Sequence, residues 1–200
     1  MIKRSFSQDD QIDFAKLSGD YNPIHLDIIK ARRTCFGQPV VHGVHILLWA
    51  LDNLVAEKLD YSKLTSLKTS FNRFIGVGEI VQFILKNKDE TCAEIQLLSE
   101  NEQVARVMVT YSTLLSEKFL NFPNEHPNRT QCLDRSAQQL SKVSGFLDLC
   151  LSQREAALLF PNLMRVFPSS QLAELIALTR LVGMECPGLH SIFSDLNLNF

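Results

Sequence analysis

The sequence lacks the cysteine pattern of a disulfide framework or of a structural zinc site. Its five cysteines are odd in number and widely spaced, and no two of them form a Cys-x-x-Cys pair. Small disulfide-rich domains and structural zinc sites both need cysteines at close, regular spacing. We therefore expect reduced thiols in a reducing compartment.

Long apolar runs and excess positive charge are also missing. No uninterrupted apolar stretch approaches the ~18 residues of a membrane span, and no apolar run follows the charged start MIKRSF, which argues against a signal peptide. The formal net charge of -2 gives no electrostatic footprint for nucleic acid or for a membrane surface. We expect a cytoplasmic protein that binds neither nucleic acid nor membrane.

What the chain does contain is enough apolar sequence for a good core. Of its 200 residues 46% are hydrophobic, which suffices for one complete domain plus part of another. Helical spacing predicts a short helix that ends at Gly19, another over Leu26–Arg33, and a strong helix over Val44–Leu59 that is apolar over much of its circumference.

After the long helix the period of the pattern changes from helical to two. Alternating apolar and polar residues predict four strands, with Gly76-Val77-Gly78 as the first hairpin turn. The strands are expected at Leu64–Phe74, Ile80–Lys86, Thr91–Leu98 and Val104–Leu115. A long helix followed by an antiparallel meander predicts an α+β domain over residues 1–118, with the sheet wrapped around the helix.

The remainder of the chain has a different composition. Residues 119–135, rich in proline, asparagine and charge, are typical of a linker. Residues 136–200 are predicted to be a helical segment plus a strand. Helices are expected at Ala137–Leu151, at Ser152–Phe160 and from Ser169 or Ser170 to Val182, with strand-like composition over Leu189–Phe200.

This second part echoes the first at low identity. A shift of 126 positions aligns Val166-Phe167-Pro168-Ser169 with Val40-Val41-His42-Gly43, and the order of breaker, apolar helix, turn and strand repeats. We expect the start of a second, incomplete module, whose missing strands follow Phe200 in a longer protein or come from elsewhere. A tail that merely packs on the first module is the alternative.

One stretch carries residues suited to acid and base chemistry. Asp20 and His25 lie five positions apart around an Asn22-Pro23 turn, so their side chains can share one water. An imidazole titrates near neutral pH and burial tunes a carboxylate upward, which suits reversible addition of water. Gly43, opening the long helix, offers a backbone N–H to a carbonyl oxygen.

Each of these residues also has a structural interpretation. Asp20 and Asn22 are common in turns, His25 can be a surface histidine, and local hydrogen bonds can satisfy His42 and His45. A metal site from His25, His42 and His45 is a further alternative. It is disfavoured because no carboxylate or thiolate falls at metal-ligand spacing with them, and we expect no metal.

The same stretch resembles a known family. Phe14 to Asp27, FAKLSGDYNPIHLD, followed by Ala31, Gly37, Pro39 and Val41-His42-Gly43, closely resembles the MaoC-like hot-dog hydratases, the (R)-specific enoyl-CoA hydratase and dehydratase family. Val77-Gly78-Glu79 is similar to that family's Val-x-x-Gly-Asp turn, with Glu for Asp and a shorter gap. The resemblance covers about residues 7–115 and is specific in its Asp-x-Asn-Pro-x-His spacing.

The resemblance implies a hot-dog fold, a homodimer and a lyase activity. A trans-2-enoyl thioester gains water to give the (R)-3-hydroxyacyl thioester, or the reverse. By residue match, Asp20 and His25 are the catalytic pair, the Gly43 N–H holds the thioester oxygen, and Asn22 and Pro23 support the turn.

No metal or redox cofactor is implied by the resemblance, since coenzyme A or an acyl carrier protein carries the substrate. The long helix Val44–Leu59 is expected to line the acyl pocket. Positions 126 beyond Asp20 and His25 are Phe146 and Leu151, so a second module would be non-catalytic. A non-catalytic acyl-binding or scaffolding module is the main alternative function, and thioester hydrolysis is a weaker one.

Overall fold

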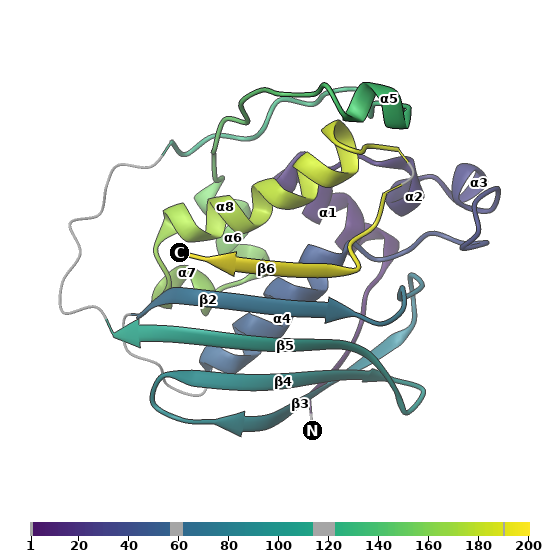
Figure 1. Ribbon diagram of the computed structural model, residues 1–200. Helices are drawn as coiled ribbons and strands as arrows, with labels where there is room; N and C mark the ends of the chain where they lie inside the picture. The colour runs from purple at the N-terminus through teal and green to yellow at the C-terminus, as the bar shows by residue number, and fades with distance from the viewer. Residues whose placement is uncertain (1, 57–61, 114–122, 190) are drawn as a thin grey trace.

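A curved antiparallel sheet wraps around one buried helix, α4 (Gly43–Ala56) (Figure 1). The computed structural model describes residues 2–56, 62–113, 123–189 and 191–200. Within these ranges the sheet has the strand order β1-β3-β4-β5-β2-β6. Its strands are β1 (Ile2–Ser5), β2 (Ser62–Phe71), β3 (Ile80–Lys88), β4 (Cys92–Ser99), β5 (Glu102–Thr113) and β6 (Asp195–Asn199).

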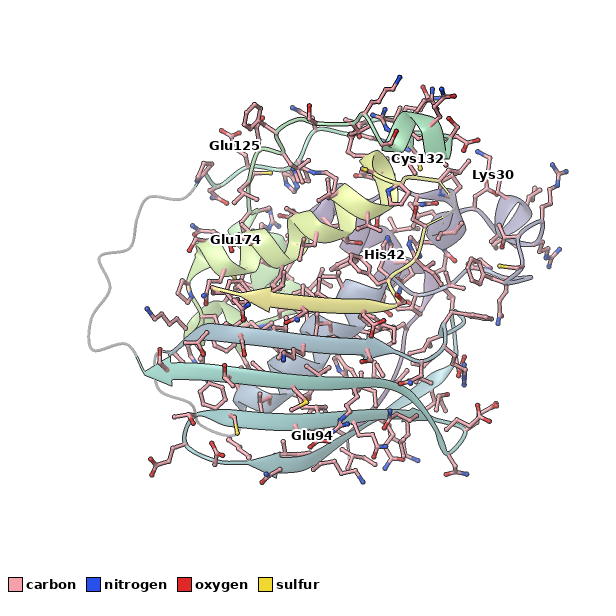
Figure 2. The ribbon with its side chains drawn as sticks, viewed as in Figure 1. Lys30, His42, Glu94, Glu125, Cys132 and Glu174 are labelled. Atoms are coloured by element: carbon pink, nitrogen blue, oxygen red, sulfur yellow. The ribbon has the colours of Figure 1, made fainter. Side chains whose placement is uncertain are left out.

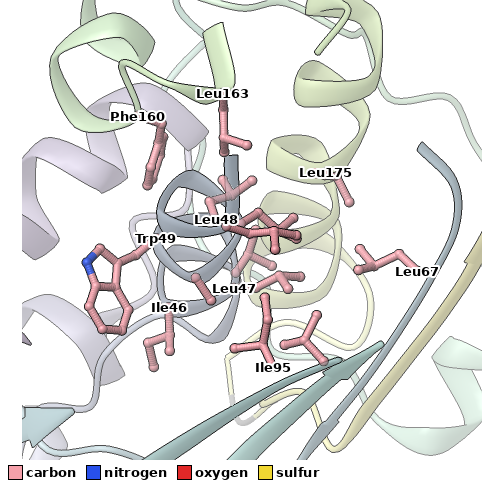
Figure 3. Packing of buried hydrophobic residues seen from close by; sticks show 14 of the residues in the cluster. Ile46, Leu47, Leu48, Trp49, Leu67, Ile95, Phe160, Leu163 and Leu175 are labelled. Atoms are coloured by element: carbon pink, nitrogen blue, oxygen red, sulfur yellow. The ribbon is translucent and has the colours of Figure 1, made fainter. Parts of the chain in front are cut away.

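Helix α4 is buried on nearly all sides because the sheet covers one side and helices from the end of the chain cover the other. Leu47, Leu48 and Leu51 are completely buried, and each contributes roughly 1.5–3 kcal/mol by leaving water. Figure 3 shows Leu47 and Leu48 between Leu67 and Ile95 of the sheet and Leu163 and Leu175 of the later helices. The prediction of a long apolar helix wrapped by a sheet is confirmed up to Ala56, while the predicted end at Leu59 lies outside the described residues.

The predicted strands are confirmed within a few residues, apart from the predicted end at Leu115, which lies outside the described residues. The predicted connection of the first pair is wrong. Strand β2 pairs with β5 and β6 and does not pair with β3, so Gly76-Val77-Gly78 is not a hairpin turn. The turn instead lies against the segment before α4, where Val41 N donates to Ile75 O at 2.8 Å and Val40 forms a bridge with Gly76. Turn residues mark a reversal and do not select the partner strand.

The segment around the Asn-Pro turn forms three short elements. Helix α1 (Gln8–Ser18) confirms the first predicted helix. The short helix predicted over Leu26–Arg33 is confirmed only as α3 (Ile28–Ala31), because Leu26 belongs to α2 (Pro23–Leu26) and the chain breaks at Asp27. Asp27 has an extended backbone and its side chain accepts from Ile29 N and Lys30 N, so it ends one helix and caps the next.

The last third of the chain is helical in part. Helices α6 (Gln153–Leu159) and α8 (Ser169–Arg180) confirm two predictions, and α8 continues into a π-helical turn, η1 (Leu181–Glu185); a short helix, α7 (Leu163–Val166), was not predicted. The predicted helix Ala137–Leu151 is wrong, since only α5 (Ala137–Leu140) forms there. Helix α5 buries no residue, and a helix without a packed face is marginal.

Both parts of the chain share one hydrophobic cluster. Helix α8 packs against α1 and α4, and Gln171 on α8 donates to Leu64 O and accepts from Leu64 N, both at 2.8 Å. Strand β6 pairs antiparallel with β2, with Leu198 opposite Leu67. The helix-then-strand order agrees with the predicted echo, while the second, incomplete hot dog and the boundaries at 118 and 136 remain predictions.

None of the helices in the described ranges is long and apolar enough to cross a membrane.

Candidate active site

Asp20 leaves helix α1 at a sharply defined point. Ser7 and Asp10 form a capping box at the start of α1, and Gly19 ends the helix in the left-handed conformation, with φ of +76°. Glycine adopts this conformation at no steric cost. A Cβ at residue 19 would also lie 2.9 Å from the side chains of Arg180 and Pro127. The chain therefore turns tightly, and the next side chain points into the protein.

The Asp20 carboxyl is 1% exposed and has two hydrogen-bond donors. Its Oδ1 accepts from Asn22 N at 3.1 Å and its Oδ2 accepts from Thr179 Oγ1 at 2.7 Å. Burial raises the pKa of Asp20 above its ordinary value, although the charge of His25 and these two hydrogen bonds act in the opposite direction. The balance favours the protonated acid more than at an exposed aspartate.

Asn22 holds the turn in place from both sides. Its Oδ1 accepts from Ile24 N at 3.1 Å and so caps α2, which has Pro23 at its first position. Its Nδ2 donates to Gly183 O at 2.8 Å, across 161 positions of the chain. Both ends of the Asn22 amide are bonded to backbone groups, so this side chain shapes the turn and is not placed to react.

His25 is 6% exposed and has one ring nitrogen committed to the backbone. Its Nδ1 lies 2.7 Å from Val40 O. A carbonyl oxygen only accepts, so Nδ1 carries the hydrogen and the lone pair of the neutral ring lies on Nε2. Burial lowers the pKa of His25 below its ordinary value, while the Asp20 charge and the Val40 hydrogen bond raise it. The arrangement provides a neutral imidazole with a proton-accepting nitrogen.

His42 lies beneath this pair, and Figure 2 shows it in the interior while Lys30 on α3 points outward. The rings of His25 and His42 stack with centroids 3.7 Å apart. His42 Nδ1 lies 2.9 Å from Gln11 Oε1 and Nε2 lies 3.1 Å from the Asp20 carbonyl oxygen. Burial holds the pKa of His42 well below its ordinary value, which makes the ring a neutral support.

His45 sits apart, in an aromatic cage. It stacks on Phe14 with centroids 4.5 Å apart and meets Phe6 and Phe160 edge to face. Neither ring nitrogen has a hydrogen-bond partner among the described residues, so the suggestion of local hydrogen bonds holds for His42 and is wrong for His45. Burial lowers the pKa of His45 to about 3, and the side chain is a neutral part of the core.

One group of side chains in the described ranges has ligand atoms close enough for a metal ion. Asp20, His25 and His42 each offer an atom within 4.8 Å of the other two. The two imidazole rings are stacked, with only 26° between their planes. Their in-plane lone pairs therefore lie in two nearly parallel planes, which is a poor arrangement for both nitrogens to reach one ion at ~2.1 Å. This geometry suits an acid/base pair better than a cation.

Gly43 opens helix α4 at the edge of the same pocket. A Cβ at this position would lie 3.5 Å from the Phe71 ring and 3.8 Å from Phe193 Cβ, so the glycine keeps the helix start open between two aromatic walls. The helix dipole of 14 residues points its positive end at the pocket. A developing negative charge beside the Gly43 N–H would be stabilised there.

The pocket joins the two parts of the chain. Its cavity is about 50 Å³, room for a few water molecules. From α4 only Gly43 and Ile46 line it, so the prediction that the long helix lines an acyl pocket is wrong for most of α4, whose faces are buried in the core. The apolar walls come from Ile46, Phe71, Phe74, Ile75, Val104, Val182, Ile192 and Phe193.

The sequence predictions missed the wall that the last third of the chain provides. Thr179 and Gly183 contact Asp20 directly. The Phe193 ring lies beside the Phe71 ring in the pocket wall, with ring centroids 6.2 Å apart. A weak signal exists in the sequence: Leu172, Ile176, Thr179 and Gly183 follow one helical face, and a hydroxyl on an otherwise apolar face needs a partner.

Comparison with known proteins agrees with this fold. The model of the MaoC-like domain matches residues 2–113. A 3-hydroxybutyryl-CoA dehydratase of Methylorubrum extorquens is 42% identical over 45 residues, which cover 22% of this chain and 29% of that protein. An (R)-specific enoyl-CoA hydratase of Aeromonas caviae is 36% identical over 58 residues, covering 29% and 42%. The chain thus spans less than half the length of either relative.

Among solved structures, a chain of the ChsH1-ChsH2 complex from Mycobacterium tuberculosis is 11% identical with a TM-score of 0.50. The match covers 56% of this chain and 92% of that one, which is a likeness of fold alone. The sheet around α4 is accordingly a hot-dog fold. Since the family model matches more than half of its residues, the chain belongs to the MaoC-like domain family.

Proposed function

We propose that this protein hydrates trans-2-enoyl thioesters to (R)-3-hydroxyacyl thioesters, and catalyses the reverse dehydration, with Asp20 and His25 as the acid/base pair. The observation that carries the proposal is the convergence of these two side chains in one pocket, with ligand atoms within 4.8 Å of each other. A water that bonds to both at ~2.8 Å needs two atoms about 4.6 Å apart.

Protonation states assign the roles in hydration. Burial lowers the pKa of His25, which keeps the imidazole neutral, and raises that of Asp20, so the carboxyl holds a proton more readily than an exposed aspartate does. We assign the base to His25 and the acid to Asp20. His25 Nε2 takes a proton from the shared water, whose oxygen bonds to C3 of the enoyl group. Asp20 gives its proton to C2. The C2–C3 double bond becomes single, and a proton returns from His25 to Asp20. In dehydration the roles reverse.

Negative charge appears on the thioester oxygen when water adds at C3. The Gly43 N–H, backed by the α4 dipole, is the group we assign to that oxygen. Water, Asp20, His25 and the Gly43 N–H supply every proton and hydrogen bond in the step, so the proposed reaction involves no metal or redox cofactor. Because both catalytic groups act from one wall, the hydrogen and the hydroxyl add to the same face; the (R) configuration rests on the family resemblance.

The thioester carrier is proposed to be coenzyme A or an acyl carrier protein. Of the basic residues near the site, Arg73 lines the pocket but is paired with Glu79 and Glu102, whereas Arg32 and Arg33 are exposed. The predicted homodimer remains a prediction. Strand β6 occupies the outer edge of β2, so a dimer would have to use a surface other than that edge.

The test is to mix the protein with crotonyl-CoA, and separately with a crotonyl carrier protein, and to follow loss of the conjugated thioester absorbance. We expect turnover by wild type and a loss of about 10²–10⁴-fold in kcat for Asp20→Asn and for His25→Gln. Absence of turnover with both substrates, or unchanged turnover in both variants, would refute the proposal. Chiral analysis of the product tests the (R) assignment.

The two alternative functions predict other results. A binding or scaffolding module has no need of converging acid and base groups and would bind the acyl thioester equally well in Asp20→Asn without turnover in either protein. Thioester hydrolysis would release free thiol, which a thiol reagent detects. The buried, converging pair favours hydration over the first alternative, and the Asp-x-Asn-Pro-x-His motif favours it over the second.

A further inference from the structure

The Asp20 carboxyl is held by residues that lie outside the matched family domain. Thr179, on α8, donates from Oγ1 to Asp20 Oδ2 at 2.7 Å, and both side chains are almost fully buried. The residues that precede Thr179 on the same helix face are apolar: Leu172, Leu175 and Ile176. The contact joins two residues 159 positions apart, so it is a tertiary contact that the fold must bring together.

The backbone after α8 supports the same carboxyl. At Gly183, in the π-helical turn η1, an added Cβ would lie 2.5 Å from Asp20 Oδ2 and 2.6 Å from Oδ1. The Gly183 carbonyl accepts from Asn22 Nδ2 at 2.8 Å and from Cys132 Sγ at 3.1 Å. Single π-helical turns occur often at functional sites. Here the turn brings the backbone against the carboxyl with no side chain between them.

We propose that Thr179 is a positioning residue, whose hydroxyl fixes the Asp20 carboxyl in the orientation that faces His25 and the pocket. The inference deepens the proposed hydratase function and rests on it for its catalytic meaning. Asp20 has one donor from its own turn, Asn22 N, on Oδ1. Without Thr179 the carboxyl loses the only described side-chain donor on Oδ2 and can rotate about its terminal torsion, which is intrinsically broad.

The hydroxyl also sets how readily Asp20 ionises. A donor to a carboxylate favours its charged form, so loss of the Thr179 hydroxyl raises the pKa of Asp20 further. The other titratable groups that face Asp20 are His25 on α2, His42 before α4 and Cys132 in the segment beside η1. All three are unchanged when Thr179 is replaced.

Two substitutions separate the hydroxyl from the packing. Thr179→Val keeps the shape and removes the hydroxyl, while Thr179→Ser keeps the hydroxyl and removes the methyl group. Thr69 on β2 supplies a matched control: it is 2% exposed, and its hydroxyl has no partner among the described residues. Thr69→Val should therefore leave the site unchanged. Thermal melts verify that each variant folds, and Thr179→Ala replaces Thr179→Val if the latter does not.

The primary measurement needs no turnover. Protein labelled with ¹³C at aspartate side-chain carboxyls is titrated by NMR, and the Asp20 resonance is identified by its loss in Asp20→Asn. We expect the Asp20 midpoint to rise in Thr179→Val and to stay at the wild-type value in Thr179→Ser and Thr69→Val. An unchanged midpoint in Thr179→Val, or an equal shift in Thr179→Ser, would overturn the proposal.

The second measurement connects the contact to catalysis. For crotonyl-CoA hydration we expect kcat to fall about 10-fold or more in Thr179→Val with little change in KM, and the alkaline limb of the kcat/KM profile to move upward with the NMR midpoint. A uniform loss at every pH would indicate a structural role only and contradict the proposal. If wild type has no turnover, the proposed function fails, while the NMR titration still decides whether Thr179 holds Asp20.

Discussion

A single methyl group added at Gly183 should damage the proposed active site more than loss of the Thr179 hydroxyl would. In Gly183→Ala the new Cβ would lie 2.5 Å from Asp20 Oδ2, whereas ordinary van der Waals contact begins at 3.4 Å. Either the carboxyl or the η1 backbone must move by ~0.9 Å. A displacement of about 1 Å at a reacting group can cost on the order of 10²-fold in rate.

Gly183→Ala should destabilise the protein, although helix propensity alone would make alanine stabilising at this position. Alanine in place of glycine within a helix stabilises by about 0.5–1 kcal/mol when space allows. Overpacking a well-packed interior costs roughly 1–3 kcal/mol. We therefore expect Gly183→Ala to lose on the order of 1–2 kcal/mol in free energy of unfolding, because the clash outweighs the gain in propensity.

Two assays on one pair of variants check this reasoning. Hydration of crotonyl-CoA gives kcat/KM, and urea unfolding gives the free energy of unfolding. Gly145→Ala is the control, since nothing lies within 4 Å of a Cβ built at that position, and it should leave both quantities near wild type. Wild-type turnover in Gly183→Ala together with a gain in stability would show that the carboxyl does not need its present position against η1.

The remaining predictions concern two buried polar groups. Because the pKa of His45 is about 3 in the folded protein and ~6.5 when unfolded, the unfolded state binds one more proton between these values and stability falls with falling pH by about 1.4 kcal/mol per pH unit. His45→Phe should remove that share of the slope in acid unfolding curves, and an unchanged slope would contradict the assignment. The Asp52 carboxylate accepts from Asn162 N, Leu163 N and Asn162 Nδ2 at 2.9–3.0 Å. Asp52→Ala should cost about 2–4 kcal/mol in urea unfolding, well above the neighbouring control Asn53→Ala.

The parts of the site that could be predicted from the sequence are those fixed by local geometry. Gly19 and Asn22-Pro23 fix a tight exit from α1, and this exit places Asp20 and His25 on either side of one turn. The start of α4 follows from an apolar helix with Gly43 at its head. Short-range physics of turns and helix ends is encoded in a few adjacent residues.

The errors have a common cause, which is that pairing partners and packing are not local. Gly76 marks a reversal, but β3 pairs with β4 and β1 because the sheet must close around α4. The helix expected at Ala137–Leu151 has acceptable residues but no surface to bury, and Phe146 remains fully exposed. Propensity without a packed face yields only the single turn α5.

The most important feature that the sequence did not predict is that both parts of the chain contribute to the site. Thr179 and Gly183 contact Asp20, and Asn22 reaches the Gly183 carbonyl. A carboxyl whose pKa is raised by burial needs something to bury it, and in the described structure α8 and η1 are what covers it. The residues proposed to react therefore come from the matched family domain, while the environment that tunes Asp20 comes from residues beyond that domain. The sequence motif identifies Asp20 and His25, whereas Thr179 and Gly183 are identified only by their contacts in the folded chain.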